Sequence, residues 1–486
     1  MVVLAILGFL VWLAWMYIAD VTQTKHAVRR NYPVLGRFRY LFEHLGEFFR
    51  QYFFALDREE LPFNRAQRTW VYRAAKNLDS TVAFGSTQPM NQPGQVIFLN
   101  TLLAPLEGEI HGGDELWFGQ GYARIPYLSN SFFNISAMSF GALSAPAITA
   151  LSHGAGQSGV WLNTGEGGLS PYHLQGGCDI VFQIGTAKYG VRDEHGGLSD
   201  EKLAEIAAIE QVRMFEIKLS QGAKPGKGGI LPGIKVTDLI ATTRGIPAGQ
   251  DSISPNRHPE INSVDDLLDM IHHVREVSGK PTGIKAVIGH SAWLDDMCQR
   301  IRQRGLQYAP DFFTVDSGDG GSGAAPQSLI DNMGLPIRRS LPLLADKLTY
   351  YGLRDRVRII ASGKLINPVD VATALCLGAD SVNTARGFMF SLGCIQAMQC
   401  NRNTCPTGVT THDTDLQKGL DPTDKAVRVA NFARNMRHEV EIIAHSCGVN
   451  HPRQFNRSHA CIIDARGYPE PMSERYPEVE TAAEYR

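Results

Sequence analysis

Three cysteines lie close together in the last quarter of the chain. Cys394, Cys400 and Cys405 are separated by five and by four residues, and Pro406 follows the last of them. Thiolates are preferred ligands of iron–sulfur clusters and of zinc. Zinc sites usually have four ligands and often contain C-x2-C pairs, so three cysteines without an obvious fourth ligand fit a three-iron cluster better. The alternative is three buried structural cysteines, and spacing alone supports both interpretations equally.

Three glycine-rich segments each follow a short apolar run, at residues 316–323, 362–364 and 384–387. In barrel proteins, backbone N–H groups of the loops after strands seven and eight bind phosphate, and the second and third segments would fall there. The chain has neither a Walker A motif nor a G-x-G-x-x-G after a first strand. Each segment alone is compatible with a simple turn, but together they predict a phosphate-bearing cofactor.

Charged side chains accompany other apolar runs. Glu166 lies in the glycine-rich loop 163–168, and three lysines fall within residues 216–229, which suits an anionic cofactor or substrate. Lys285 lies within an apolar run, where a cation is costly unless it meets an anion or hydrogen-bond acceptors. The ring of a flavin is one such partner, and a structural ion pair is the alternative.

The elements that would position these residues alternate between strands and helices. Amphipathic helical stretches such as 264–277 and 368–376 lie between short β-rich runs, which predicts a (β/α)8 TIM barrel within a domain spanning residues 96–468. The active site of such a barrel lies at the carboxyl ends of its strands. The predicted strands are 132–136, 160–163, 180–183, 214–218, 284–287, 312–315, 358–361 and 381–384.

The N-terminus has a different composition. Residues 1–19 are apolar apart from the hydroxyl of Tyr17, and a helix of this length spans the hydrocarbon core of a bilayer, roughly 30 Å. Lys25, Arg29 and Arg30 follow it, which places the rest of the chain on the cytoplasmic side. We therefore expect a single-pass transmembrane anchor in the cytoplasmic membrane, with a buried N-terminal helix as the alternative.

Two further segments flank the predicted barrel domain. Residues 20–95 are expected to form a helical connecting region, in which the aromatic residues of 41–54 lie in the membrane interface or pack on the main domain. Residues 469–486 are acidic and contain proline, and we expect a loose tail.

Composition excludes several classes of protein. The net charge of −2 provides no basic excess for binding phosphates, which argues against a nucleic-acid partner. The 48 glycines are not periodic, so a collagen-like chain is excluded. Eight cysteines in a chain of 486 residues do not indicate a disulfide framework, and the grouped three indicate a redox or metal site in a reducing compartment.

Taken together, these motifs resemble the FMN-binding synthase domain of glutamate synthase, over roughly residues 95–465. The family has a (β/α)8 barrel that carries FMN and a 3Fe-4S cluster, so the resemblance implies an oxidoreductase acting on CH–NH2 donors. The segments that carry the resemblance are 135–141, 163–168, 221–226, 319–323 and 393–406.

The resemblance also implies roles for individual residues. Cys394, Cys400 and Cys405 would hold the cluster, and Glu166 and Lys224 would lie near the substrate carboxylates as catalytic residues. Reduced FMN would deliver hydride to 2-iminoglutarate, formed from 2-oxoglutarate and ammonia, with electrons supplied by a partner protein or subunit. The implied FMN contacts are Ala137, Met138, Ser139, Asn163, Gln183, Lys218, Lys285, Gly320, Gly321, Gly323, Gly363, Ala385 and Arg386.

The sequence departs from the family pattern in two respects. The chain begins with the apolar segment rather than with the catalytic cysteine of a glutaminase domain, so we expect the nitrogen source to be other than glutamine. In the substrate loop, Lys227 replaces an acid and Ile230 replaces a glutamine, which should weaken or change the binding of 2-oxoglutarate. The alternatives are a subunit similar to N-methylglutamate synthase, an electron-transfer flavoprotein subunit, and a non-catalytic scaffold.

Overall fold

The computed structural model describes residues 1–106 and 115–486, and the chain divides into two compact units. The first unit is Met1–Thr69 and the second is Trp70–Arg486. The division falls inside the region 20–95 that was expected to be a connection.

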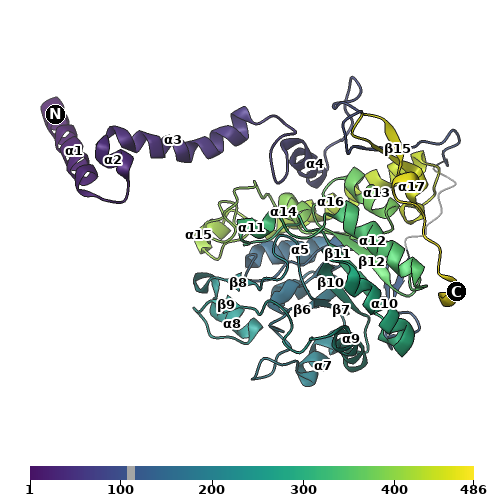
Figure 1. Ribbon diagram of the computed structural model, residues 1–486. Coiled ribbons are helices and arrows are strands. Elements are labelled where there is room, and N and C mark those ends of the chain that lie inside the picture. Colours follow the sequence, from purple (N-terminus) through teal and green to yellow (C-terminus); the bar gives the residue numbers. More distant parts are fainter. Residues whose placement is uncertain (107–114) are drawn as a thin grey trace. The chain divides into compact units, whose positions relative to one another are not determined.

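Eight parallel strands of the second unit close into a barrel (Figure 1). The closure is made by β13, which pairs with the first strand, β4. Each strand begins and ends within two residues of one of the predicted runs, so the predicted (β/α)8 barrel is confirmed. The strands are β4 (Phe133–Ile135), β5 (Leu162–Asn163), β6 (Ile180–Ile184), β7 (Val212–Lys218), β10 (Thr282–Val287), β11 (Phe312–Asp316), β12 (Arg358–Ser362) and β13 (Ser381–Thr384).

An aromatic cluster closes the barrel at the amino ends of its strands. A hairpin of β2 (Leu116–Phe118) and β3 (Tyr127–Ser129) packs there against the starts of barrel strands. Phe118 makes edge-to-face contacts with Trp161, at a centroid distance of 5.8 Å, and with Phe312, at 5.7 Å. All three side chains are at most 1% exposed. Burying so much aromatic surface stabilises this end, which leaves the opposite end of the barrel for the site.

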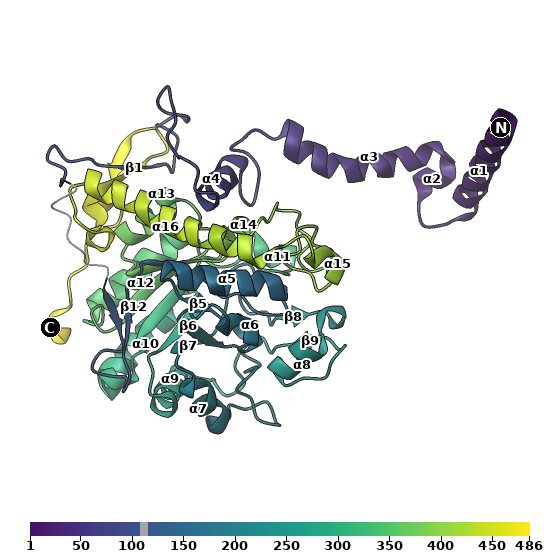
Figure 2. The ribbon, with the colours of Figure 1, turned by 180° about the vertical axis from the view of Figure 1, so that it is seen from behind.

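Helices surround the barrel, and both predicted helical stretches are confirmed, at α9 and α13. The long α16 contacts α5, which Figure 2 shows beside it. A Cβ atom at Gly154 of α5 would lie 2.4 Å from Val429 Cγ1, so this contact requires glycine. The helices are α5 (Ala145–Ser158), α6 (Pro171–Leu174), α7 (Asp200–Ala208), α8 (Asp238–Arg244), α9 (Val264–Ser278), α10 (Ala292–Arg304), α11 (Gln327–Ile330), α12 (Ile337–Tyr350), α13 (Pro368–Cys376), α14 (Arg386–Ser391), α15 (Thr414–Gln417) and α16 (Pro422–Ser446).

In addition to the hairpin β2–β3, two small antiparallel sheets lie outside the barrel in the part of the chain that the structure describes. β8 (Ile230–Leu231) and β9 (Ser252–Ile253) form a hairpin in the long segment after β7. β14 (Ala460–Ile463) pairs with β1 (Val96–Phe98) and with β15 (Pro469–Pro471), and α17 (Met472–Arg475) follows. The first residues of the segment expected to be a loose tail are therefore ordered, because β15 pairs with β14 and the α17 residue Met472 is fully buried.

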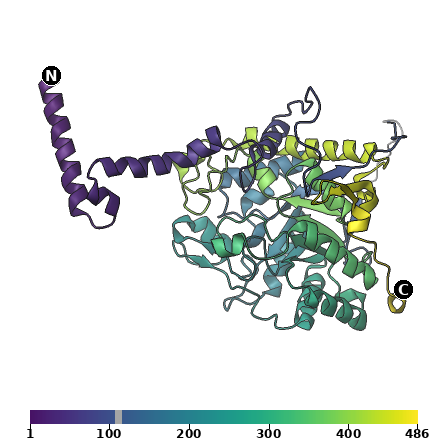
Figure 3. The same ribbon diagram turned by 45° about the horizontal axis from the view of Figure 1, so that its top comes forward.

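The first unit consists of helices. They are α1 (Val2–Thr22), α2 (Ala27–Asn31), α3 (Leu35–Phe49) and a π-helical turn, Arg50–Phe54; α4 (Arg65–Ala75) then leads into the second unit. By length and composition, α1 is long and apolar enough to cross a membrane. Figure 3 shows α1 and α3 joined through α2.

Candidate functional site

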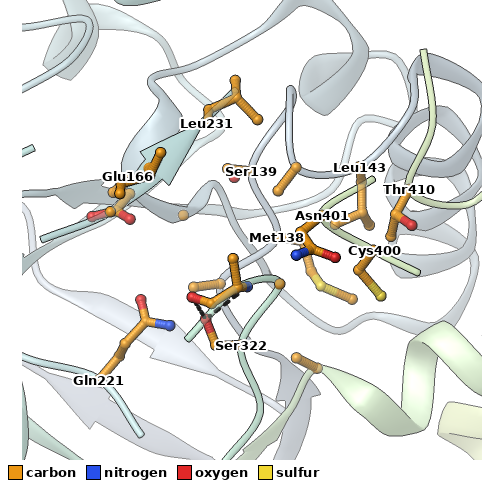
Figure 4. A pocket seen from close by; sticks show the side chains of 18 of the residues that line it. Met138, Ser139, Leu143, Glu166, Gln221, Leu231, Ser322, Cys400, Asn401 and Thr410 are labelled. Atoms are coloured by element: carbon orange, nitrogen blue, oxygen red, sulfur yellow. Dashed lines mark hydrogen bonds between the residues drawn. The ribbon is translucent and has the colours of Figure 1, made fainter. Parts of the chain in front are cut away.

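The carboxyl ends of the barrel strands surround a cavity of about 180 Å³ (Figure 4). Loops after several strands, the hairpin β8–β9 and the cysteine segment form its wall. Glu166 and Cys400 approach the cavity from opposite sides (Figure 4). Of the residues singled out in the sequence, those that line the cavity are Ala137, Met138, Ser139, Glu166, Gln183, Lys218, Lys224, Ile230, Gly321, Gly323, Ala385, Arg386 and Cys400.

The glycine-rich loops approach one another so closely that side chains would not fit. At Gly363 of the loop after β12, where φ is +109°, a Cβ atom would lie 2.5 Å from Ser317 Cβ of the loop after β11. Within the loop after β11, a Cβ atom at Gly320 would lie 2.9 Å from the Ser317 carbonyl oxygen. At Gly321 it would lie 2.7 Å from Arg386 Nε, whose guanidinium donates through Nη2 to the Ser322 carbonyl at 2.7 Å. The loops after β11, β12 and β13 therefore converge, with exposed backbone and one guanidinium, in an arrangement that fits a phosphate group.

Glu166 carries a negative charge within a cluster of cations. Its Oε2 lies 2.9 Å from Lys218 Nζ, and its side chain is 20% exposed. Burial alone would raise the pKa of Glu166, but the cations of Lys218 and Lys224 lower it to about 2. Burial lowers the pKa of Lys224, although Glu166 partly offsets this. The cavity thus holds a permanent carboxylate beside cations that can bind an anion.

Lys285 lies in β10 and is not among the residues that line the cavity. Its Nζ is 3.4 Å from Asp316 Oδ2. Burial alone would lower the pKa of Lys285, but the nearby carboxylates of Asp316 and Glu216 raise it above its usual value. The structure therefore places the predicted cation in an ion pair at the end of the barrel that carries the site.

A buried carboxylate that the sequence reasoning did not identify organises the predicted residues. Glu216 of β7 is 1% exposed, and its Oε1 accepts hydrogen bonds from Asn163 Nδ2 at 2.9 Å and from Gln183 Nε2 at 2.6 Å. Its Oε2 accepts from Thr314 Oγ1 at 2.6 Å. Both amides thus donate to one anion, which fixes their orientation and leaves the amide oxygen of Gln183 for the cavity that it lines. The signal in the sequence was a glutamate between two apolar residues, Phe215 and Ile217, within a predicted strand.

Replacing Glu216 by leucine should lower the free energy of unfolding by about 3–5 kcal/mol, because Asn163, Gln183 and Thr314 would lose their acceptor inside the barrel. Urea denaturation measures the change. Thr314→Val removes only one of the three bonds and should cost about 1 kcal/mol. Equal unfolding midpoints for Glu216→Leu and the parent protein would show that the three bonds do not stabilise the barrel.

Arg244, at the end of α8, is a second residue that the sequence reasoning missed. It lines the cavity and is 5% exposed. Its Nη1 donates to Ser252 Oγ at 3.0 Å, but its Nε has no hydrogen-bond partner among residues 1–106 and 115–486. Burial lowers the pKa of Arg244. A buried guanidinium N–H without an acceptor is costly, so this atom marks a position for an anionic group. No local motif identifies it, since it reaches the cavity only when α8 folds over the barrel mouth.

The three grouped cysteines line a second, smaller cavity of about 30 Å³. Their thiols form no disulfide. Burial raises the pKa of Cys394 to about 11, whereas at Cys405 hydrogen bonding from Thr407 outweighs burial and the pKa is lowered. Within residues 1–106 and 115–486, no group of three or more His, Cys, Asp or Glu side chains is close enough to hold a single metal ion. Cluster ligands bind separate irons, however, so three thiols around one cavity fit a cluster better than an ion.

Lys235 joins the cysteine segment to the rest of the site. Its buried Nζ donates to the carbonyl oxygens of Thr410 at 2.9 Å, Ala142 at 3.2 Å and Cys400 at 3.4 Å. Burial lowers the pKa of Lys235 to about 8. One side chain therefore connects the segment after β7, the loop after β4 and the cysteine segment.

Comparison with known proteins supports the family resemblance. Residues 124–450, more than half of the chain, match the profile described as a conserved region in glutamate synthase. The chain belongs to the glutamate synthase family. It is 39% identical over 483 residues to the glutamate synthase large subunit-like protein YerD of Bacillus subtilis, covering 92% of this chain and 91% of that protein. As a member of this family, it is an oxidoreductase of the class that acts on CH–NH2 donors.

A second relative of this glutamate synthase family member is matched over a smaller share of its length. The chain is 35% identical over 317 residues to the archaeal-type glutamate synthase [NADPH] of Thermotoga maritima, and this match covers 65% of the chain but 59% of the relative. Among solved structures, a flavocytochrome b2 variant with bound pyruvate is similar at 15% identity and a TM-score of 0.45, covering 86% of this chain and 87% of that one.

A buried histidine should make this glutamate synthase family member sensitive to acid. His173 is fully buried; its Nε2 donates to the Met138 carbonyl at 3.0 Å, and its Nδ1 accepts from the Ser170 N–H at 3.2 Å. Burial lowers the pKa of His173 to about 4, from an ordinary 6.5. Between these values the unfolded chain binds a proton that the folded chain does not. The free energy of unfolding should therefore fall, by roughly 3 kcal/mol, as the pH drops from 6.5 to 4.

Urea titrations across this pH range test the expectation. His173→Asn should reduce the slope of the unfolding free energy against pH, because one of the contributing groups is removed. His153, which is exposed, offers a matched control, and His153→Asn should leave the slope unchanged. Equal slopes for His173→Asn and the parent would contradict the assignment.

Proposed function

We propose that the protein is a membrane-anchored FMN and iron–sulfur oxidoreductase that reductively aminates 2-oxoglutarate or a related 2-oxo dicarboxylic acid through an imine. The observation that carries the proposal is the pair of cations at the cavity, Lys224 and the unsatisfied Arg244, beside the ionised Glu166. Two buried cations beside a carboxylate already paired with Lys218 suit a substrate with two carboxylates.

The glycine-rich loops and Arg386 support FMN as the cofactor, because they offer backbone N–H groups and a guanidinium for its phosphate. Gln183 would present its amide oxygen to an N–H group of the ring, held in that orientation by Glu216. Lys285 would supply the positive charge that favours a reduced, anionic flavin. Bound FMN supplies hydride chemistry at this site.

Cys394, Cys400 and Cys405 are the proposed ligands of a 3Fe-4S cluster, which supplies single-electron chemistry. Support comes from the shared cavity of the three thiols and from Cys400, which also lines the larger cavity. The electron donor in this proposal is a separate protein or subunit that delivers electrons on the cysteine side.

In the proposed reaction, a 2-oxo acid and ammonia condense with loss of water, and the imine gains a hydride and a proton. Arg244 and Lys224 hold the carboxylates and thereby orient the carbon that is reduced. Because the pKa of Glu166 is about 2, this side chain stays ionised near neutral pH and stabilises a cationic iminium nitrogen.

Ile230 favours one variant of this function. It lines the cavity at the position where the family usually has glutamine. An apolar side chain there suits a methyl group better than an oxygen, so methylamine is the second nitrogen donor to examine, as in an enzyme similar to N-methylglutamate synthase.

Flavin reoxidation tests the proposal directly. The protein, purified anaerobically in detergent and reduced with dithionite, is mixed with 2-oxoglutarate plus ammonia or plus methylamine, and flavin absorbance is followed. Reoxidation with formation of glutamate or N-methylglutamate is the expected result. If no 2-oxo dicarboxylate reoxidises the reduced flavin, but an added electron acceptor protein does, the proposed amination would be wrong. The result would then indicate an electron-transfer function.

Anchoring is a separate part of the proposal. It is supported by α1, whose length and apolar composition suit a single-pass span, and by the basic residues that follow it. The chain should stay with the membrane fraction after extraction with alkaline carbonate. Its release into the supernatant would remove the anchor from the proposal and leave the chemistry untouched.

A further inference from the structure

We propose that α3 lies within the headgroup region of an anionic bilayer, parallel to the membrane surface, and that Asp20 fixes it to the end of α1. This inference rests on the proposed anchoring of α1. It assigns a second, in-plane contact with lipid to a helix that is too short and too charged to cross a membrane.

The apolar side chains of α3 lie on one face and are exposed. They recur at intervals of three and four residues, which places them along one side of the helix. Ring contacts follow the same face: the centroids of Phe38 and Phe42 are 6.3 Å apart, and those of Phe49 and Phe53 are 5.4 Å apart. The side chains that are 42–69% exposed are Leu35, Phe38, Leu41, Phe42, Phe48 and Phe49.

An exposed apolar patch of this kind is expected to contact another apolar surface. Contiguous aromatic surface is rarely left in water, and aromatic rings favour the boundary between headgroups and acyl chains. The 15 residues of α3 extend over only about 22 Å, less than a bilayer core, and the helix contains Arg37, Arg39 and Glu43. An amphipathic helix with these properties lies in the plane of the interface rather than across it.

Asp20 connects the three helices of this unit. It is fully buried near the end of α1, where a carboxylate is unfavourable for the helix dipole and needs compensation. Its Oδ1 accepts from Arg29 Nη2 of α2 at 2.6 Å; its Oδ2 accepts from Arg37 Nε of α3 at 2.8 Å and from the Val34 N–H at 3.0 Å. The direction of α3 relative to α1 is thereby fixed at the level where the apolar helix ends.

The charge of this region selects the kind of lipid. Residues 20–54 contain six Lys or Arg and three Asp or Glu, which gives a net charge of +3. Four of the basic side chains are exposed: Lys25, Arg30, Arg39 and Arg50. Exposed basic residues beside a membrane span bind anionic headgroups, so a negatively charged leaflet is the surface that fits.

Hydrogen exchange of the full-length protein tests this assignment. The protein is reconstituted into nanodiscs of phosphatidylcholine, with and without phosphatidylglycerol, and exchange is followed by mass spectrometry in peptides from residues 35–49. In the anionic discs, we expect amide exchange in the parent protein to be about tenfold slower than in the double variant Phe42→Ser/Phe49→Ser. Glu43→Ser, a change on the opposite face, should keep the protection. Asp20→Asn should speed exchange in residues 24–49 while the chain stays in the disc.

Three outcomes would overturn the inference. Unprotected α3 amides in a chain that resists carbonate extraction would refute the in-plane helix and keep the anchor. Protection that is equal in both lipids and in detergent, and accompanied by a concentration-dependent dimer, would assign the face to a second copy of the chain. Release of the chain from the membrane by carbonate would remove the anchor and, with it, the in-plane helix.

Discussion

Replacing Arg244 by methionine should lower kcat/KM for the 2-oxo acid by roughly 100-fold, or about 2.7 kcal/mol, with the flavin still bound. Arg244 is 5% exposed, and within the part of the chain that the structure describes its Nε has no hydrogen-bond partner. A substrate carboxylate would satisfy that donor and would lose the interaction in the variant. Because a carboxylate contact acts in both the ground state and the transition state, most of the loss should appear in KM.

Arg192 offers a matched control for this experiment. Its guanidinium lies 5.9 Å from the centroid of the Tyr189 ring, which Arg244 also contacts at 5.1 Å, but Arg192 does not line the cavity. Arg192→Met should therefore leave kcat/KM close to the parent value. Unchanged kinetics in Arg244→Met, with flavin bound and the protein folded, would move the carboxylate site elsewhere in the cavity.

Replacing Cys400 by serine should abolish the iron content of the protein while the barrel stays folded and FMN stays bound. Serine is a poor ligand for iron–sulfur clusters compared with thiolate, and two remaining cysteines would not hold a three-iron cluster. Electron delivery from the physiological donor should then fail, whereas flavin reduced chemically should still be reoxidised by the imine. Iron analysis and electron paramagnetic resonance measure the first effect, and stopped-flow absorbance measures the second.

Cys298→Ser is the control for the cluster experiment. Cys298 is a free, fully buried cysteine on α10 and lies outside the grouped three. Its replacement should leave the iron content unchanged. Full iron occupancy in Cys400→Ser would show that Cys400 is not a ligand.

Much of the barrel was predictable because its strands are short apolar runs bounded by glycine-rich or polar loops. β13 has the predicted bounds, and β12 extends beyond its own predicted run by one residue, Ser362. The same logic predicted that the glycine-rich and polar clusters would meet at one end of the barrel, since the carboxyl ends of parallel strands meet there. The family resemblance singled out Glu166 and Lys224 among them, and both line the cavity. Boundaries inside the less regular β5 were less accurate, because only Leu162 and Asn163 pair as strand there.

The residues that the sequence reasoning missed depend on tertiary contacts. The Glu216 carboxylate accepts hydrogen bonds from side chains of three other strands, those of Asn163, Gln183 and Thr314. No local sequence pattern predicts that these side chains contact one carboxylate. Arg244 lies far along the segment that follows β7 and reaches the cavity only through the fold of that segment. The ordered start of the C-terminal segment was missed for a similar reason, because β15 depends on pairing with β14.

The aromatic hairpin at the amino ends of the barrel strands restricts the route of the nitrogen donor. Phe118, Trp161 and Phe312 fill the barrel axis there with side chains that are at most 1% exposed. Their close packing, within the residues that the structure describes, obstructs the axis at that end to a small molecule. In a reaction of the proposed kind, ammonia or methylamine would therefore enter from the same end of the barrel as the 2-oxo acid, so a bound 2-oxo acid would slow the entry of the nitrogen donor.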